Sequence, residues 1–98
     1  MKPPPAFTER ILTLHPEGKS GVNIEKSKYD QMRDAIMAVL ADHPEIGFSE
    51  CNRLVAKLLD GKFDGKVSWY FVSVKMDLET RGVLSRFKKG GLQMIRKN

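Results

Sequence analysis

Cysteine and histidine, the side chains that most often hold metals or carry nucleophilic chemistry, are scarce in this chain. The single cysteine, Cys51, cannot form an internal disulfide, and neither His15 nor His43 stands at a metal-ligand spacing from it. We therefore expect Cys51 to be a half-buried structural thiol. No Ser-His-Asp or paired-carboxylate arrangement stands out, so we expect no catalysis, no cofactor and no metal.

Long apolar runs are also absent. No stretch approaches the roughly 20 residues that a membrane-spanning helix needs, and the proline-rich residues 1–5 are not followed by the apolar segment of a secretory signal. The 98 residues suffice for one domain that buries roughly two thirds of its unfolded surface. With the lone cysteine, these features favour a cytoplasmic protein that has no membrane partner.

Acidic residues are missing from the last thirteen positions. The chain has 17 Lys and Arg against 12 Asp and Glu, and the resulting net charge of +5 is carried entirely by residues 86–98. Such asymmetry indicates a local anionic partner, although a solubilising basic tail would give the same count. The basic residues of this segment are Arg86, Lys88, Lys89, Arg96 and Lys97.

The chain is predicted to divide into a partly disordered N-terminal arm, residues 1–24, and one folded domain, residues 25–98. Within the arm, three consecutive prolines at 3–5 favour an extended, poorly ordered chain. Residues 7–14 are apolar and fit the spacing of a helix as well as that of a strand. Residues 17–23 form a predicted loop, because Gly18 and Gly21 are turn points within it.

Two helices open the predicted domain. The first is expected over residues 25–41 and ends before Pro44, since the residue preceding a proline avoids the helical region. The second is expected over residues 49–59, with Ser49 as the N-cap whose hydroxyl accepts a free backbone N–H. The predicted buried side chains are Tyr29, Met32, Ile36, Val39 and Leu40 in the first helix, and Leu54, Val55, Leu58 and Leu59 in the second.

A third helix and a basic hairpin complete the predicted domain. The helix is expected over residues 67–81, after a glycine-bounded turn at 61–65, and it ends at Gly82, which tolerates a left-handed cap. Its inward stripe is Val67, Phe71, Val74 and Leu78. Two short strands are expected at 83–87 and 92–96, joined by a tight Lys-Lys-Gly-Gly turn.

This order of elements, helix, turn, helix and basic β-hairpin, resembles a winged helix-turn-helix. The segments that resemble those of many bacterial regulators are Phe48-Ser49-Glu50 and Leu78-Glu79-Thr80-Arg81-Gly82-Val83-Leu84. A narrower resemblance, to a small bacterial winged-helix family of unknown function, rests on Gly21-Val22-Asn23-Ile24, Lys28-Tyr29 and Val67-Ser68-Trp69-Tyr70. The resemblance implies an α+β fold with a three-helix core and a C-terminal β-hairpin wing, a fold that serves DNA binding and protein docking alike.

The resemblance also implies a way of binding double-stranded DNA, as in a transcriptional regulator. In the usual winged-helix docking, the third helix enters the major groove and the wing lies along the backbone. Pairing as a homodimer would compensate for the weak affinity of one module. The residues predicted to contact DNA are Lys66, Ser68, Trp69, Tyr70 and Ser73 around the start of the third helix, and Arg86, Lys88, Lys89, Arg96 and Lys97 on the wing.

The outward face of the third helix favours a different function. The side chains expected on it are Trp69, Val72, Ser73, Met76 and Thr80. None of them is an Arg, Lys, Asn or Gln, the residues that usually read base edges. Trp69, Val72 and Met76 would instead form an apolar patch of the kind that marks a contact surface. The alternative function is therefore a protein-interaction or dimerisation module that binds no DNA.

Three further expectations concern the same helix. Ser68 is also a candidate for its N-cap, and Asp77 is expected to be a solvated helix residue. The apolar residues 7–14 need a cover, so they pack on Trp69 of the same chain or on a second chain. Packing on Trp69 would remove the helix from DNA binding.

Overall fold

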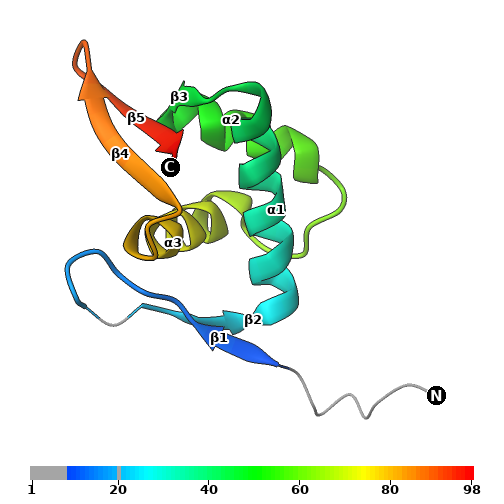
Figure 1. The fold of residues 1–98 in the computed structure, drawn as a ribbon. Coiled ribbons are helices and arrows are strands. Elements are labelled where there is room, and N and C mark those ends of the chain that lie inside the picture. Colours follow the sequence, from blue (N-terminus) through cyan, green and yellow to red (C-terminus); the bar gives the residue numbers. More distant parts are fainter. Residues whose placement is uncertain (1–8, 20) are drawn as a thin grey trace.

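The computed structural model describes residues 9–19 and 21–98, which form an α+β fold of three helices and two small antiparallel sheets (Figure 1). The predictions for residues 1–5 and for Phe7 lie outside the described residues. Every helix in the described part of the chain is too short or too polar to span a lipid bilayer.

All three predicted helices are confirmed to within one residue at each end. They are α1 (Lys26–Asp42), α2 (Phe48–Leu59) and α3 (Val67–Thr80). The predicted apolar stripe of α1 is buried along its whole length. Gly82 follows α3 with a φ of +80°, and its N–H donates to the carbonyl of Glu79, so the predicted left-handed cap is confirmed.

The start of α2 differs from the prediction. Strand β3 (Glu45–Gly47) runs directly into the helix, so Gly47 is the N-cap and no side chain caps the first turn. The prediction that Ser49 caps α2 is therefore wrong. It missed β3 because a three-residue strand with one buried side chain, Ile46, gives no readable periodicity.

The buried stripe of α2 also differs from the prediction. Cys51, Val55 and Leu59, each four residues apart, face the core, and Cys51 is fully buried rather than half-buried. Leu54 is only partly buried, and Leu58 is 47% exposed, so the prediction that Leu58 is buried is wrong. The helix therefore leaves an apolar side chain in solvent.

The C-terminal hairpin consists of β4 (Leu84–Lys89) and β5 (Leu92–Lys97), joined by Gly90 and Gly91, both with positive φ. Both predicted strands are confirmed, but Lys88 and Lys89, predicted in the turn, are the last two residues of β4. The hairpin is joined by β3, which pairs with β5, so the strand order of the sheet is β3-β5-β4.

The N-terminal hairpin, formed by β1 (Arg10–Leu12) and β2 (Asn23–Glu25), resolves the choice between helix and strand for the described part of residues 7–14 in favour of a strand. β1 pairs antiparallel with β2, with Ile11 opposite Ile24. The described residues of the predicted loop, 17–19 and 21–22, are outside helices and strands as expected, whereas Asn23 belongs to β2. The predicted boundary between residues 24 and 25 falls inside β2, and the hairpin packs directly against α1.

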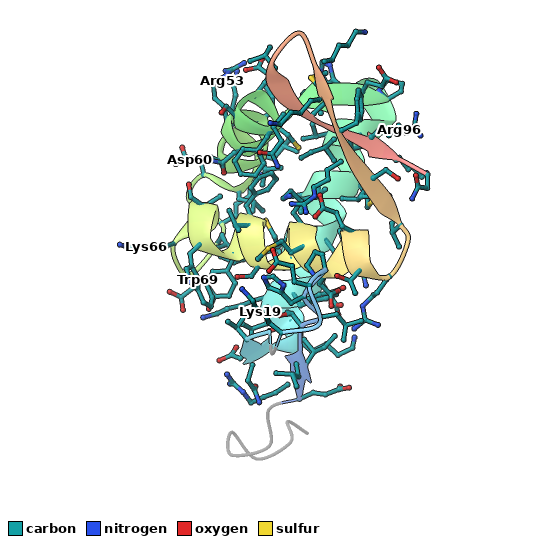
Figure 2. All side chains as sticks on the ribbon, turned by 90° about the vertical axis from the view of Figure 1, so that its left-hand side faces the viewer. Lys19, Arg53, Asp60, Lys66, Trp69 and Arg96 are labelled. Atoms are coloured by element: carbon teal, nitrogen blue, oxygen red, sulfur yellow. The ribbon has the colours of Figure 1, made fainter. Side chains whose placement is uncertain are left out.

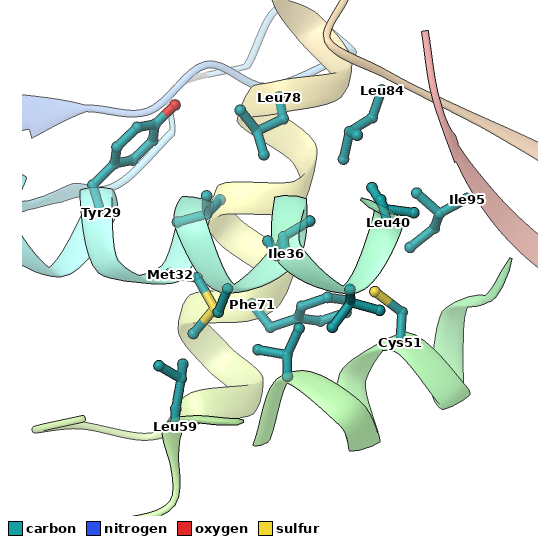
Figure 3. Close-up of a cluster of buried hydrophobic side chains, with 14 of the residues drawn as sticks. Tyr29, Met32, Ile36, Leu40, Cys51, Leu59, Phe71, Leu78, Leu84 and Ile95 are labelled. Carbon is teal, nitrogen blue, oxygen red and sulfur yellow. The ribbon is translucent and has the colours of Figure 1, made fainter. Parts of the chain in front are cut away.

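One apolar core joins all three helices to the C-terminal hairpin (Figure 3). Phe71 of α3 lies at its centre, between Met32 and Ile36 of α1 and the buried side of α2. Leu84 and Ile95 close the core from β4 and β5. The base of the C-terminal hairpin is therefore held by buried apolar side chains, which fixes its direction relative to α3.

Candidate nucleic-acid interface

Helix α3 lies between the two hairpins. Figures 1 and 2 both place the C-terminal hairpin on one side of the helix and the N-terminal hairpin on the other. The predicted DNA-contacting residues come from the start of α3 and from the C-terminal hairpin. Their exposure and partners decide which of them can meet a ligand.

The start of α3 presents a lysine and an aromatic cluster. Lys66 is the N-cap residue, and its side chain is exposed. Trp69 is 46% exposed, and its ring lies edge-on to Tyr70, with 4.9 Å between centroids. Tyr70 packs in the same way on Phe63 at 5.0 Å. These contacts hold the indole in a fixed orientation at the surface (Figure 2).

Ser68 is not the N-cap of α3, because Lys66 takes that position. Its hydroxyl instead accepts a hydrogen bond from the side-chain amide (Nδ2) of Asn52 on α2, at 3.3 Å. Asn52 is thus a neighbour of the predicted site that the sequence did not reveal, since the two residues lie 16 positions apart in different helices. The contact links the start of α3 to α2.

Ser73 does not lie on the outward face. It is 8% exposed, so the expectation that it faces solvent is wrong. Ser73 precedes Asp77, which is also buried, by one helical turn, so the two side chains lie on the same side of α3. The expected packing of residues 7–14 on Trp69 is not found in the described part of that segment: the backbone N–H of Leu14 donates to Asp77, and Trp69 is 46% exposed.

Asp77 is fully buried, so its predicted solvation is also wrong. Its carboxylate accepts hydrogen bonds from the Tyr29 hydroxyl, from Arg81 Nε at 2.8 Å and from the backbone N–H of Leu14 at 2.7 Å. Burial, followed by the hydrogen bond to Asp77, raises the pKa of Tyr29 to about 12. This network joins the N-terminal hairpin, α1 and the end of α3 at one carboxylate.

A second buried polar group lies on another side of α3. Lys75 and Glu79 form an ion pair at 2.9 Å, and both side chains are more than nine tenths buried. The ammonium of Lys75 lies 5.2 Å from the ring centre of Phe48, a cation–π contact. Helix α3 therefore buries charged groups in addition to its apolar stripe.

The exposed stripe of α3 is apolar, as predicted. Val72 and Met76 are partly exposed and follow Trp69 along the helix at spacings of three and four residues. The hydroxyl of Thr80, the next residue of the stripe, donates to the carbonyl of Met76 at 2.8 Å. None of the side chains of this stripe is an Arg, Lys, Asn or Gln, the residues that most often read base edges through hydrogen bonds.

The five basic residues of the C-terminal segment do not share one surface. Side chains alternate between the two faces of a strand, so Arg86 and Lys88 lie on the face that Leu84 turns toward the helices. Lys97, opposite Leu84 in the register, shares this face at the hairpin base. Lys89 and Arg96 lie on the outer face.

The two faces also differ in their partners. On the outer face, Lys89 lies 4.0 Å from a carboxylate oxygen of Glu45, and the Arg96 guanidinium lies 5.6 Å from the ring centre of Phe87. Within the described residues, neither Arg86 nor Lys88 has a carboxylate within 4.0 Å, and the same holds for Lys66. Arg86 and Lys88 thus lie on the helix-side face of the hairpin and Lys66 lies at the start of α3, each without a carboxylate partner among the described residues.

Neither a metal site nor a reactive cysteine is found in the part of the chain that the structure describes. That part holds no group of three or more His, Cys, Asp or Glu residues able to bind a metal. Burial raises the pKa of the Cys51 thiol to about 11, so it stays protonated at neutral pH and is a poor nucleophile.

Comparison with known proteins identifies a family but no activity. No curated protein and no solved structure matches the chain. A family model described as a family of unknown function, DUF6958, matches residues 10–94, from the first strand of the N-terminal hairpin to the last strand of the C-terminal one. The chain therefore belongs to DUF6958, a family of unknown function.

Proposed function

We propose that this protein is a winged-helix protein that binds double-stranded DNA, mainly through the phosphate backbone. The observation that supports this best is the position of Lys66, at the start of α3, and of Arg86 and Lys88, on the helix-side face of the hairpin, three exposed cations that lack carboxylate partners among the described residues. Figure 2 shows the C-terminal hairpin above α3, with Lys66 at the start of the helix. Phosphate oxygens are the natural partners of such unpaired cations.

The binding is expected to depend little on base sequence. Direct readout requires hydrogen-bonding side chains aimed at base edges, and the exposed stripe of α3 carries Trp69, Val72 and Met76 instead. These side chains suit apolar contact with sugars or thymine methyl groups. Specificity, where it exists, would then come from the shape of the duplex rather than from hydrogen bonds to bases.

The expected affinity is modest and depends strongly on salt. Three phosphate contacts give a slope of about −2.7 in the plot of log binding constant against log salt, which corresponds to a roughly 40-fold loss between 50 and 200 mM. Such a module would work at physiological salt only with help from pairing or from a high local concentration of DNA.

Fluorescence anisotropy with a labelled 20-base-pair duplex at 50 mM salt tests this proposal. The Arg86→Ala/Lys88→Ala variant removes two of the three cations of the helix-side face, leaving Lys97 at the hairpin base, and is expected to bind about tenfold more weakly. The matched control is Lys89→Ala/Arg96→Ala, which removes the same charge from the outer face and is expected to bind nearly as well as wild type. Absence of binding by the wild type, or equal losses in both variants, would contradict the proposal.

A second candidate is a protein-interaction module built on the same stripe. The observation in its favour is that Trp69, the only tryptophan, is 46% exposed and continues into Val72 and Met76. Tryptophan is enriched at the centres of interfaces. This function predicts that Trp69→Ala alters sedimentation while leaving any DNA affinity intact, whereas loss of DNA affinity with unchanged sedimentation would exclude self-association.

A further inference from the structure

A groove between the end of α1 and the end of α2 is not used by the proposed DNA surface. Its volume is about 440 Å³. Figure 1 shows the end of α2 on one side of α1 and the C-terminal hairpin on the other. A ligand in this groove would therefore leave Arg86 and Lys88 free.

The floor of the groove is apolar. Leu54 and Leu58, one turn apart on α2, face Val39 of α1 across it. Val39 is buried, whereas Leu58 is the half-exposed side chain that the core of α2 leaves out. The floor therefore offers apolar surface that a ligand could cover, and the hydrophobic effect favours that burial.

The rim of the groove carries excess positive charge. Lys57 and Lys62 line it, both are exposed, and neither has a carboxylate within 4.0 Å among the described residues. The turn that carries Lys62 is bonded to α1, because the side-chain amide (Nε2) of Gln31 donates to the backbone carbonyl of Lys62 at 3.0 Å. Asp42 is the one carboxylate in the lining, so one positive charge remains to be neutralised.

We propose that this groove binds a small amphipathic carboxylate, such as a medium-chain aliphatic acid. The carboxylate pairs with Lys57 and Lys62, and the hydrocarbon chain lies on Leu58, Leu54 and Val39. The volume lies toward the lower end of the range for small-molecule sites, which favours a ligand of this size over a partner helix. The site does not depend on the proposed DNA binding, so either proposal can fail while the other stands.

A titration of the ¹⁵N-labelled protein with sodium octanoate, followed by amide chemical shifts, tests the site. We expect saturable shifts confined to residues around Leu54, Lys57 and Lys62, with a dissociation constant in the millimolar range, as befits about ten non-hydrogen atoms. Octanol, which has the same chain and no charge, is expected to bind at least fivefold more weakly. Absence of shifts at 10 mM octanoate, shifts centred on α3, or equal affinity for octanol would overturn the proposal.

Two variants separate the charged rim from the apolar floor. Lys57→Gln/Lys62→Gln is expected to weaken octanoate binding about fivefold, the effect of losing two exposed ion pairs, and Leu58→Ser to weaken it by a similar factor. The matched control, Arg10→Gln/Lys19→Gln, removes two charges from the N-terminal hairpin and should bind as wild type does. All five side chains are exposed, so the fold should survive. Wild-type affinity in both groove variants, or equal loss in the control, would refute the site.

Discussion

The two hairpins flank the same helix, but different chemistry anchors them. The N-terminal hairpin is held through a backbone N–H, that of Leu14, which donates to the buried carboxylate of Asp77. The C-terminal hairpin is held by Leu84 and Ile95, two buried apolar side chains. Packing is common to both hairpins, because Ile24 of the N-terminal one is also buried in the core. The N-terminal hairpin differs in having a directional, polar anchor as well.

This difference has consequences for the surface beside α3. The polar anchor uses a charged acceptor inside the protein, the carboxylate of Asp77, which is fully buried and bonded to the N-terminal hairpin. The apolar anchor uses only the base of the C-terminal hairpin and leaves the outer part of β4 free to carry unpaired cations. One hairpin therefore bonds to a buried carboxylate of α3, and the other extends the surface that we propose meets DNA.

The largest expected effect comes from breaking the polar anchor. Asp77→Ala leaves the Tyr29 hydroxyl, the Arg81 guanidinium and the Leu14 N–H without their acceptor, and loss of one partner of a buried charged network typically costs about 3–5 kcal/mol. Urea unfolding measures this loss. The control is Asp34→Ala, which removes an exposed carboxylate and should change stability by less than about 0.5 kcal/mol. A cost below about 1 kcal/mol for Asp77→Ala would show that the anchor is unimportant.

A smaller effect, dependent on pH, is expected at Tyr29. Tyr29→Phe removes one hydrogen bond to Asp77 and should cost about 1–2 kcal/mol near neutral pH. Because the folded-state pKa of about 12 lies above the unfolded value near 10, the wild type loses stability as pH rises from 10 toward 12. The difference in stability between wild type and variant should therefore shrink over that range. Cys51, whose pKa is raised to about 11, titrates in both proteins, so its effect cancels in the difference.

Unfolding of both proteins in urea at pH 8 and at pH 11 measures this gap. A gap that stays constant or widens at the higher pH would mean that Tyr29 is not ionising from the bonded, buried state described here.

Much of this fold could be predicted because the three helices and the C-terminal hairpin have apolar residues at regular spacings in the local sequence. The polar contacts of α3 have no such local pattern. Asp77 bonds to Tyr29 and Leu14, 48 and 63 positions away, so only the assembled fold shows that it is buried. Ser73, one turn earlier, is buried as well, although the spacing of the apolar stripe predicts the outward face for it.

The candidate site was predicted only in part for a related reason. The sequence identifies the five basic residues of the last thirteen, but which of them share a face depends on where β4 begins and on its register with β5. That register places Arg86 and Lys88 on one face of the hairpin and Lys89 and Arg96 on the opposite face. The groove beside Leu58 was missed because an apolar residue at helical spacing normally predicts burial.

The smallest expected effect compares single lysines of the two hairpins. Lys88, on the helix-side face of β4, has no carboxylate partner among the described residues, whereas Lys19, in the loop of the N-terminal hairpin, pairs with Glu17 at 3.1 Å. Lys88→Ala should weaken duplex binding about threefold at 100 mM salt, and Lys19→Ala should leave it unchanged. Anisotropy titrations measure both affinities. An equal loss in the two variants would mean that DNA binding depends only on the net charge of the protein and not on the position of the lysine.

The most direct measurement is the salt dependence of duplex binding for the wild type and for Arg86→Ala/Lys88→Ala, between 50 and 200 mM salt. If one face of the C-terminal hairpin carries the phosphate contacts, the wild type should lose about 40-fold in affinity and the variant, left with one contact, only about fourfold. Identical slopes for the two proteins would contradict the proposal that Arg86 and Lys88 meet the backbone.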